Sequence, residues 1–346
     1  MRRAVRILLP LLAILASAAP GAEAPANPPP LAESVADIVP AHCRMVWMQN
    51  QAEGPIDMHG PHIKVAGYDS ADGRGERMVC DDEGSYFMPM LTGDGERVVF
   101  TDTTRWVVCV VGFDGAGRRD LCEGLALETW RDPQTGTDYV FVQRGPYTHG
   151  KRVENPVYRV NIDDSTDEQL FWDKTPVVFN NFQLSADGRK VAIEAPWPRC
   201  ITAELPNGDW RVFGRGCYAS MSPDNSYITF HMDGRHRSLF FFTSSGRRWW
   251  EVPFNTVPGF DGRKIHQPRW SNHYRYIVMT GPRSEGGERE DPGAHHHIGA
   301  HVARLSEDLR EVEVWARADD GGRECMFPDA WIAGGEQVAA PDLAAA

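Results

Sequence analysis

Residues 181–193 have the sequence NFQLSADGRKVAI, in which a polar turn separates two apolar segments. The turn centres on Asp187-Gly188, a pair typical of tight β-hairpins because glycine accepts the positive φ that such turns need. The segment after it, KVAI at 190–193, has the apolar and β-branched residues that favour a buried strand. We therefore predict a β-hairpin with a strongly apolar second strand.

The same pattern recurs along the chain. Clear copies lie at 87–100 (FMPMLTGDGERVVF), 218–230 (YASMSPDNSYITF) and 267–279 (QPRWSNHYRYIVM), and a looser one at 127–142 (LETWRDPQTGTDYVFV). Two further strand signals follow each copy, at 105–113 and 118–122, 156–162 and 168–172, 200–205 and 209–213, 237–243 and 247–252, and 297–305 and 311–315. Four strands repeated at intervals of roughly 40 residues indicate β-propeller blades. A β-sandwich, the alternative, does not require the same unit five times.

The two ends of the chain complete a sixth unit. Residues 327–332 (FPDAWI) match the first strand of a unit, and 45–48, 63–68 and 77–80 supply the second, third and fourth strands. Pairing the two ends would close the ring and cover its edge strands. The expected fold is an all-β, six-bladed propeller of four-stranded blades, closed by N- and C-terminal strands in one blade. Residues 43–335 would form this single domain, with a disordered tail at 336–346.

Two of the repeats carry a family resemblance. SADGRKVAI at 185–193 and MSPDNSYITF at 221–230 resemble the WD40-like repeats of the TolB-type secreted bacterial β-propellers. The resemblance covers roughly residues 43–335, although Asn272-His273 and Pro133-Gln134 replace the usual Asp-Gly turn. It implies a six-bladed propeller, and it implies a ligand-binding, scaffolding or envelope-complex role more than a particular chemistry.

The first 24 residues read as a signal peptide. Arg2, Arg3 and Arg6 precede the apolar run 7–16, and Ala22-Glu23-Ala24 is an A-x-A cleavage site. The run is too short to span a bilayer when a cleavage site follows it. Residues 25–42, rich in Pro and Ala, read as a linker. We expect an exported protein, periplasmic or extracellular, without a membrane span and monomeric.

Seven cysteines in an exported chain are candidates for disulfides, and the odd number leaves at least one unpaired. The hairpin turn between Cys109 and Cys122 centres between Gly115 and Ala116, so the two cysteines are expected to face one another and form a disulfide. Cys200 and Cys217 are a second candidate pair.

The net charge and the motifs limit the classes of function that the sequence supports. The formal net charge of −12 argues against a nucleic-acid partner. No nucleophile elbow, P-loop, dinucleotide fingerprint or H-E-x-x-H motif is present in the sequence. Catalytic residues therefore stay unassigned, and whether the protein is an enzyme stays open.

The first strand of each predicted blade lines the central axis, so its polar residues are candidates for ligand contact at the channel mouth where these strands begin. Glu128, Asn181 and Tyr218 fall on such strands. The tryptophans mostly fall at blade-strand positions and are expected to pack in the core between blades. The candidates selected for binding a saccharide or other small polar ligand are Asn180, Gln183, His266, Gln267, Arg269 and Asp329. The alternative is a polar, water-filled axis without a specific ligand.

A histidine run suggests a metal. His295, His297 and His301 alternate onto one face of a predicted strand, and His266 with Gln267 could complete a divalent-metal site. Oligogalacturonate lyases, also secreted propellers, look similar in ligand types, which makes a metal-assisted polysaccharide (uronide) lyase the second hypothesis. The alternative is a solvated run of surface histidines, in which case no cofactor is required.

Overall fold

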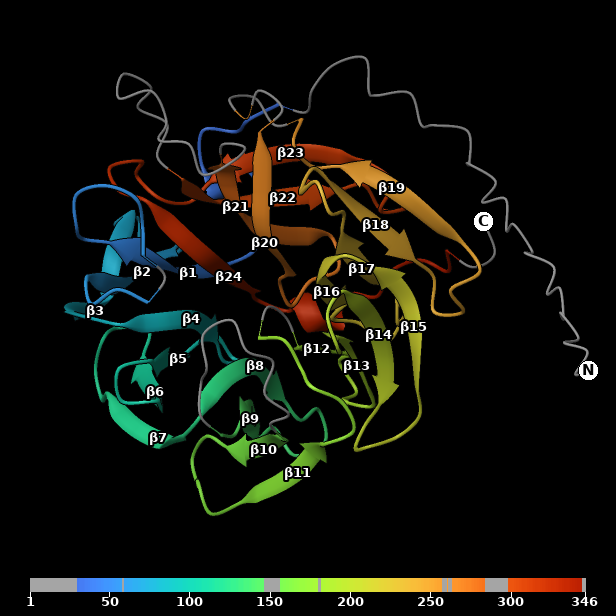
Figure 1. The fold of residues 1–346 in the computed structure, drawn as a ribbon. Helices are drawn as coiled ribbons and strands as arrows, with labels where there is room; N and C mark the ends of the chain where they lie inside the picture. Colours follow the sequence, from blue (N-terminus) through green and yellow to red (C-terminus); the bar gives the residue numbers. More distant parts are fainter. Residues whose placement is uncertain are drawn as a thin grey trace, which may run out of the picture.

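The computed structural model describes residues 30–57, 59–145, 156–179, 182–256, 260, 263–283 and 298–343. Within these residues the strands form six four-stranded antiparallel sheets, arranged as blades around a central axis (Figure 1). The innermost strands β4, β8, β12, β16, β20 and β24 gather at the middle of the ring. The predicted six-bladed architecture is confirmed.

The first blade joins the two ends of the chain. It contains β24 (Cys325–Ile332), β1 (Cys43–Asn50), β2 (Ile63–Asp69) and β3 (Glu76–Gly84), in that order from the axis outward. β24 and β1 are antiparallel, with Met45 opposite Ala330 and Met48 opposite Met326. The predicted closure of the ring is therefore correct.

The other blades follow in chain order, each running from the axis outward. The second has β4 (Tyr86–Leu91), β5 (Arg97–Asp102), β6 (Val107–Gly112) and β7 (Arg119–Glu123). The third has β8 (Leu125–Arg131), β9 (Asp138–Gln143), β10 (Val157–Asn161) and β11 (Glu168–Trp172). The fourth has β12 (Phe182–Leu184), β13 (Lys190–Glu194), β14 (Arg199–Glu204) and β15 (Trp210–Arg215). The fifth has β16 (Cys217–Met221), β17 (Thr229–Met232), β18 (Ser238–Phe242) and β19 (Trp249–Pro253), and the sixth has β20 (Lys264–Trp270), β21 (Tyr276–Arg283), β22 (Gly299–Leu305) and β23 (Val312–Arg317).

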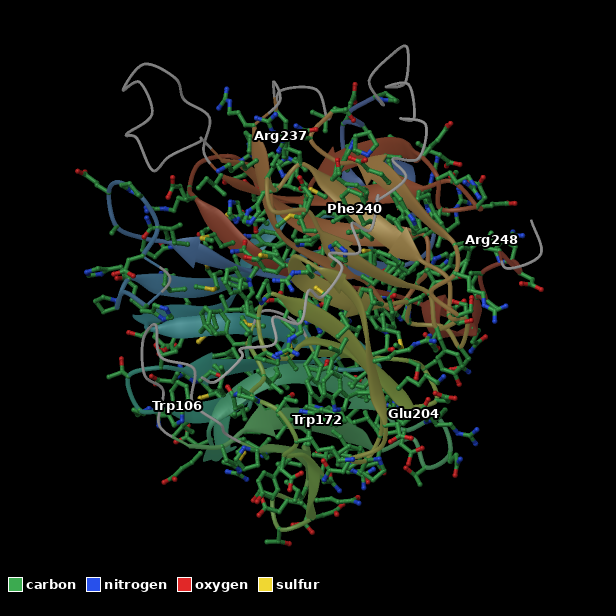
Figure 2. The ribbon with its side chains drawn as sticks, turned by 45° about the vertical axis from the view of Figure 1, so that its right-hand side comes forward. Trp106, Trp172, Glu204, Arg237, Phe240 and Arg248 are labelled. Carbon is green, nitrogen blue, oxygen red and sulfur yellow. The ribbon has the colours of Figure 1, made fainter. Side chains whose placement is uncertain are left out.

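Burial follows position within a blade. Second strands such as β9 and β17 are buried along their whole length, because strands flank them on both sides and neighbouring blades cover both faces. Outer strands such as β15 are largely exposed. Side chains fill the space between blades, whereas Glu204 and Arg248 extend from the periphery (Figure 2). The core therefore consists of apolar layers between neighbouring blades, and other side chains lie on the central axis.

Residues at both ends of the domain pack against it. Within the predicted linker, α1 (Val35–Ile38) buries Val35 and Ile38 and is capped by Ser34. The composition predicts a disordered tail from residue 336. In the structure η2 (Gly335–Gln337) is followed by a segment in which the Ala340 N–H donates to Asp224 and Leu343 is buried. These contacts involve part of the predicted tail, and residues 344–346 lie outside the described residues. No helix among the described residues is long and apolar enough to cross a membrane.

The predicted Cys109–Cys122 disulfide is wrong, and all seven cysteines are free thiols. Val110 faces Arg119 and Cys109 faces Asp120, so the turn between β6 and β7 centres between Asp114 and Gly115, and a bulge between Val108 and Cys109 then places Cys122 opposite Val108. Cys109 then packs in one apolar layer and Cys122 against another. A single-residue register shift moves a side chain to the opposite face of its sheet, which separates the two sulfurs. Cys200 and Cys217 are also unpaired with each other.

Candidate functional site

Irregularities in the innermost strands place polar side chains on the axis. The pairing register shifts between Ala126 and Glu128 on β8 and between His266 and Arg269 on β20. A similar shift precedes Asp329 on β24. Such bulges re-aim the side chain that follows them.

Two of these irregularities share a backbone motif. Gln267 and Phe327 have φ of 50° and 52°, and each precedes a proline. Proline is tolerated because the innermost strand has a free edge toward the axis and needs no N–H donor there. The left-handed residue is strained, and the strain occurs where the strand turns a charged side chain inward.

Three ionisable side chains meet on the axis and form what we call the axial triad, Arg269, Glu128 and Asp329. Arg269 Nε donates to Asp329 Oδ1 at 2.9 Å and Nη2 donates to Glu128 Oε1 at 2.5 Å. The three side chains are 7–9% exposed and come from the sixth, third and first blades. Asp329 Oδ2 also accepts the Leu91 N–H at 2.8 Å. Glu128 Oε2 is buried and has no hydrogen-bond partner.

Burial dominates the electrostatics of the triad. It raises the pKa of Glu128 to about 8, against the opposing effect of Arg269, and nearby Asp329 adds to the rise. Burial also raises the pKa of Asp329, again opposed by Arg269. For Arg269, burial lowers the pKa, but the two carboxyl groups outweigh it and the pKa is raised. Removing one member of such a buried cluster costs about 3–5 kcal/mol, because charge is left uncompensated.

Gln183 supports the triad from the fourth blade. Its Nε2 donates to the Trp270 carbonyl at 2.9 Å, and its Oε1 accepts the Trp270 N–H at 3.3 Å. The amide therefore fixes the backbone next to Arg269. Both ends of the side chain are occupied, so Gln183 acts as a positioning residue.

A cavity of about 720 Å³ opens above the triad. The residues that line it come mainly from the far ends of innermost strands and from the turns that follow, and they include Glu128, Gln183, Arg269, Asp329, Trp130 and Trp331. On the other side of Arg269 a void of only about 10 Å³ reaches Gln267 and Met88. The triad is thus the floor of the cavity.

The cavity lies at the end of the channel opposite to the one expected from the sequence. We expect a site where the innermost strands begin, but aromatic side chains occupy that end. The ring of Phe87 lies 4.9 Å from that of Phe327 and 5.4 Å from those of Phe179 and His59, measured between centroids. Apolar rings lie at the strand starts, whereas polar residues at the strand ends line the cavity.

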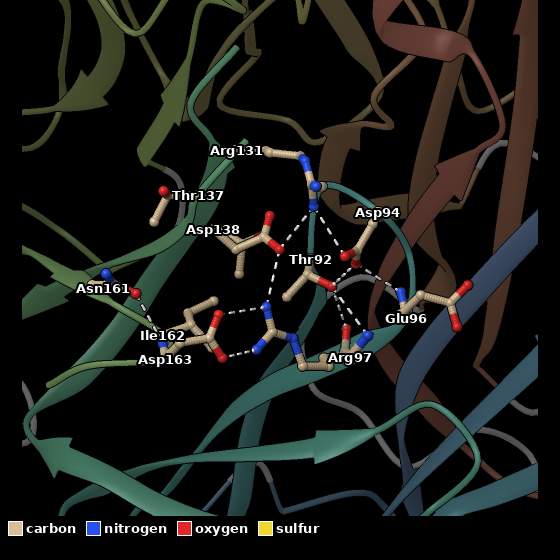
Figure 3. Close-up of polar contacts among 12 residues, drawn as sticks. Thr92, Asp94, Glu96, Arg97, Arg131, Thr137, Asp138, Asn161, Ile162 and Asp163 are labelled. Atoms are coloured by element: carbon tan, nitrogen blue, oxygen red, sulfur yellow. Dashed lines mark hydrogen bonds and ion pairs between the residues drawn. The ribbon is translucent and has the colours of Figure 1, made fainter. Parts of the chain in front are cut away.

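An ion-pair network stiffens the rim of the cavity between the second and third blades (Figure 3). Arg131 Nη1 contacts Asp94 Oδ2 at 2.9 Å and Asp138 Oδ2 at 3.0 Å. Arg97 joins Asp138 at 3.0 Å and Asp163 at 2.5 Å. Arg131 is therefore held at the rim by two carboxylates from different blades.

The structure brings some of the sequence candidates together and separates others. Gln183, Arg269 and Asp329 meet at the cavity floor. Gln267 is buried beneath, with Oε1 unpartnered, in the small void. His266 Nε2 lies 3.4 Å from His236 Nδ1 and does not line the cavity. Asn180 lies outside the described residues.

The tryptophans of the cavity wall are residues that sequence reasoning assigns to the core. Trp130 and Trp331 are half-buried and line the cavity. The signal is a shared pattern, Glu128-Thr129-Trp130 and Asp329-Ala330-Trp331, in which an acidic residue precedes tryptophan by two positions. Each pair places a carboxyl group on the floor and an indole on the wall.

Of the three histidines in the predicted metal-binding run, only His301 is among the described residues. It is buried, its Nδ1 lies 3.2 Å from the Gly299 carbonyl, and its ring packs edge-on against Phe260. Burial lowers its pKa to about 4. His295 and His297 lie outside the described residues, and within the described part of the chain no three His, Cys, Asp or Glu side chains form a potential metal site.

Comparisons with known proteins bear on the fold. No protein-family model and no curated protein matches the chain. TolB from Acinetobacter baumannii is similar in structure, with a TM-score of 0.56 and 11% identity over 83% of this chain and 66% of that one. The fold is that of a TolB-type six-bladed propeller. A candidate TolB from Agrobacterium tumefaciens gives a TM-score of 0.48 and 12% identity, covering 86% of this chain and 96% of that one. Regucalcin from the same organism, a calcium-binding protein, gives a TM-score of 0.47 and 11% identity, covering 65% of this chain and 77% of that one.

Proposed function

We propose that the protein is an exported, monomeric binding propeller that holds a saccharide or other small polar ligand in the cavity above the axial triad. The observation that carries the proposal is the unpartnered carboxyl oxygen of Glu128 at the floor of this cavity. Buried polar atoms are rarely left without a partner, and a hydrogen-bonding group of a ligand would supply the missing one.

Size and lining support a small ligand. Ligand cavities commonly measure about 300–1,000 Å³, and this one holds about 720 Å³. The indoles of Trp130 and Trp331 provide apolar wall beside the polar floor. Aromatic wall with a few fixed polar groups suits a sugar, which has apolar C–H faces and hydroxyl edges.

The arrangement of Arg269 disfavours the uronide lyase. Its Nε and Nη2 donate to Asp329 and Glu128, so this arginine is not free to receive the carboxylate of a ligand through a bidentate contact. A uronide would instead bring its carboxylate toward two acidic side chains. Binding of a neutral or basic saccharide is the better-supported function.

The test is a glycan array probed with the purified protein. A cavity-filling variant, Ala186→Trp, changes a residue that lines the cavity, and Ala116→Trp makes the same substitution in an exposed turn between β6 and β7. We expect glycans to bind wild type and Ala116→Trp equally, and Ala186→Trp at least tenfold more weakly. Equal binding by all three proteins, or no binding by wild type, would reject the cavity as the site.

A further inference from the structure

The cavity has an excess of acidic side chains. Five acidic residues line it, namely Asp94, Glu128, Asp132, Asp329 and Glu336. The basic residues in its lining are Arg131 and Arg269. A cavity of this composition attracts positive charge, because the low-dielectric walls concentrate the field of its carboxylates.

Each arginine is already paired with two carboxyl groups. Arg269 donates to Glu128 and Asp329, and Arg131 contacts Asp94 and Asp138. The positive charges in the lining are therefore already neutralised. An anionic ligand would meet carboxylates without an unpaired cation among the described lining residues.

Glu128 supplies the specific contact point. Its side chain is 8% exposed, and one oxygen is fixed by Arg269 while Oε2 has no partner. A hydroxyl or an ammonium could each donate to Oε2. A charge-assisted bond from an ammonium is roughly twice as strong as a neutral one, and the remaining acidic groups favour it further.

Building on the proposed function, we propose that the ligand of this cavity carries a protonated amine, which donates to Glu128 Oε2. The ligand class is then a polyhydroxylated amine such as an amino sugar or amino polyol. The hydroxyls contact the polar rim, and the ammonium reaches the floor.

Proton release accompanies this mode of binding. The charged groups that face Glu128 are Arg269 from β20 and Asp329 from β24, and the rim adds Asp94, Arg131, Asp132 and Glu336. Burial raises the pKa of Glu128 to about 8, so the carboxyl group holds its proton at pH 7. An incoming ammonium favours the carboxylate form, and the carboxyl proton passes to solvent. Binding should therefore strengthen between pH 6 and 8.

The experiment uses three six-carbon polyols that differ at one carbon: glucamine with an ammonium, sorbitol with a hydroxyl and gluconate with a carboxylate. Their binding to the full-length mature protein is measured by calorimetry at pH 7 in two buffers of different ionisation enthalpy. We expect glucamine to bind at least tenfold more tightly than sorbitol and gluconate to bind weakest, with up to one proton released per glucamine. Glu128→Gln should lose the preference for glucamine and the proton release, whereas Glu204→Gln, the same change on the outer part of the fourth blade, should keep both (Figure 2).

The outcomes separate the two proposals. Sorbitol binding as well as glucamine, with Ala186→Trp weakening both, would overturn the amine and leave the cavity as the binding site. The proposal of an amine ligand would also be overturned if glucamine bound without releasing a proton, or if the wild type did not bind glucamine. The glycan array then decides whether the cavity is a binding site. Because the wild-type preference alone tests the proposal, a Glu128→Gln variant that fails to fold does not remove the test.

Discussion

Trp130 of the third blade lies against Gly188 in the Asp-Gly turn of the fourth. A Cβ added at Gly188 would stand 2.4 Å from the indole ring, and Trp130 Nε1 donates to the Ala186 carbonyl at 3.1 Å. Trp331 makes the same arrangement with Gly95 of the second blade, and its Nε1 donates to the Gly93 carbonyl at 2.9 Å. The turn that defines each repeat therefore also joins neighbouring blades at the cavity rim.

Gly188→Ala should destabilise the propeller through this contact. Gly246 is the matched control, because its φ of 68° equals that of Gly188 within a degree and nothing lies within 4 Å of an added Cβ. Both variants carry the cost of alanine at positive φ, and Gly188→Ala adds overpacking of about 1–3 kcal/mol. Urea unfolding of both variants measures the difference. Equal losses of unfolding free energy would contradict the packing of Trp130 on the turn.

Glu128→Gln should change the pH dependence of stability. The folded-state pKa of Glu128 is about 8, raised by burial from an ordinary value of 4.5, so the folded protein binds this proton more tightly than the unfolded chain. The contribution of Glu128 to the free energy of unfolding of the wild type is greatest below pH 4.5 and declines as pH rises toward 8. Relative to wild type, Glu128→Gln should therefore gain stability between pH 4.5 and 8. Thermal unfolding of both proteins at pH 5 and pH 8 tests this prediction. A difference in melting temperature that is the same at both pH values would contradict it.

Loss of β24 should prevent folding. A chain ending at Glu324 lacks the innermost strand of the first blade and leaves β1 with an open edge, whereas a chain ending at Ala333 keeps β24 paired. We expect a cooperative unfolding transition for the longer chain and none for the shorter one. A folded shorter chain, seen by near-ultraviolet circular dichroism, would show that closure by β24 is dispensable.

All seven cysteines should react with a thiol reagent in denaturant without prior reduction, because the structure has them as free thiols. Mass spectrometry after alkylation counts the labels. Reducing agent should leave the melting temperature unchanged. Five or fewer labels on the non-reduced protein would reveal a disulfide that the structure does not contain.

The sequence predicts the architecture well because turn and strand signals are local. An Asp-Gly turn before an apolar strand, as at Asp187 and Gly188, requires no knowledge of distant residues. Ring closure also follows, since 327–332 lacks partners within its own end of the chain. The site is less predictable because it depends on bulges, which shift the pairing register without a clear sequence signal.

Pairing register and blade packing explain the incorrect predictions for the cysteine pair and for the cavity residues. Symmetry places Cys109 opposite Cys122 only if the turn centres between Gly115 and Ala116, but Cys109 pairs with Asp120 and a bulge beyond it shifts Cys122 to face Val108. Glu128 and Trp130 appear in the sequence as one axial residue and one core residue. Their shared place at the cavity depends on how blades pack against one another, which is a tertiary property.

A crystal structure of the mature protein with glucamine would show directly where the ligand binds and which of its atoms contacts Glu128. We predict electron density in the cavity between Trp130 and Trp331, with the ligand nitrogen about 2.7–3.2 Å from Glu128 Oε2. Ligand bound beside Phe87 and Phe327 at the other end of the axis, or on the outer surface of the blades with the cavity unoccupied, would contradict this prediction.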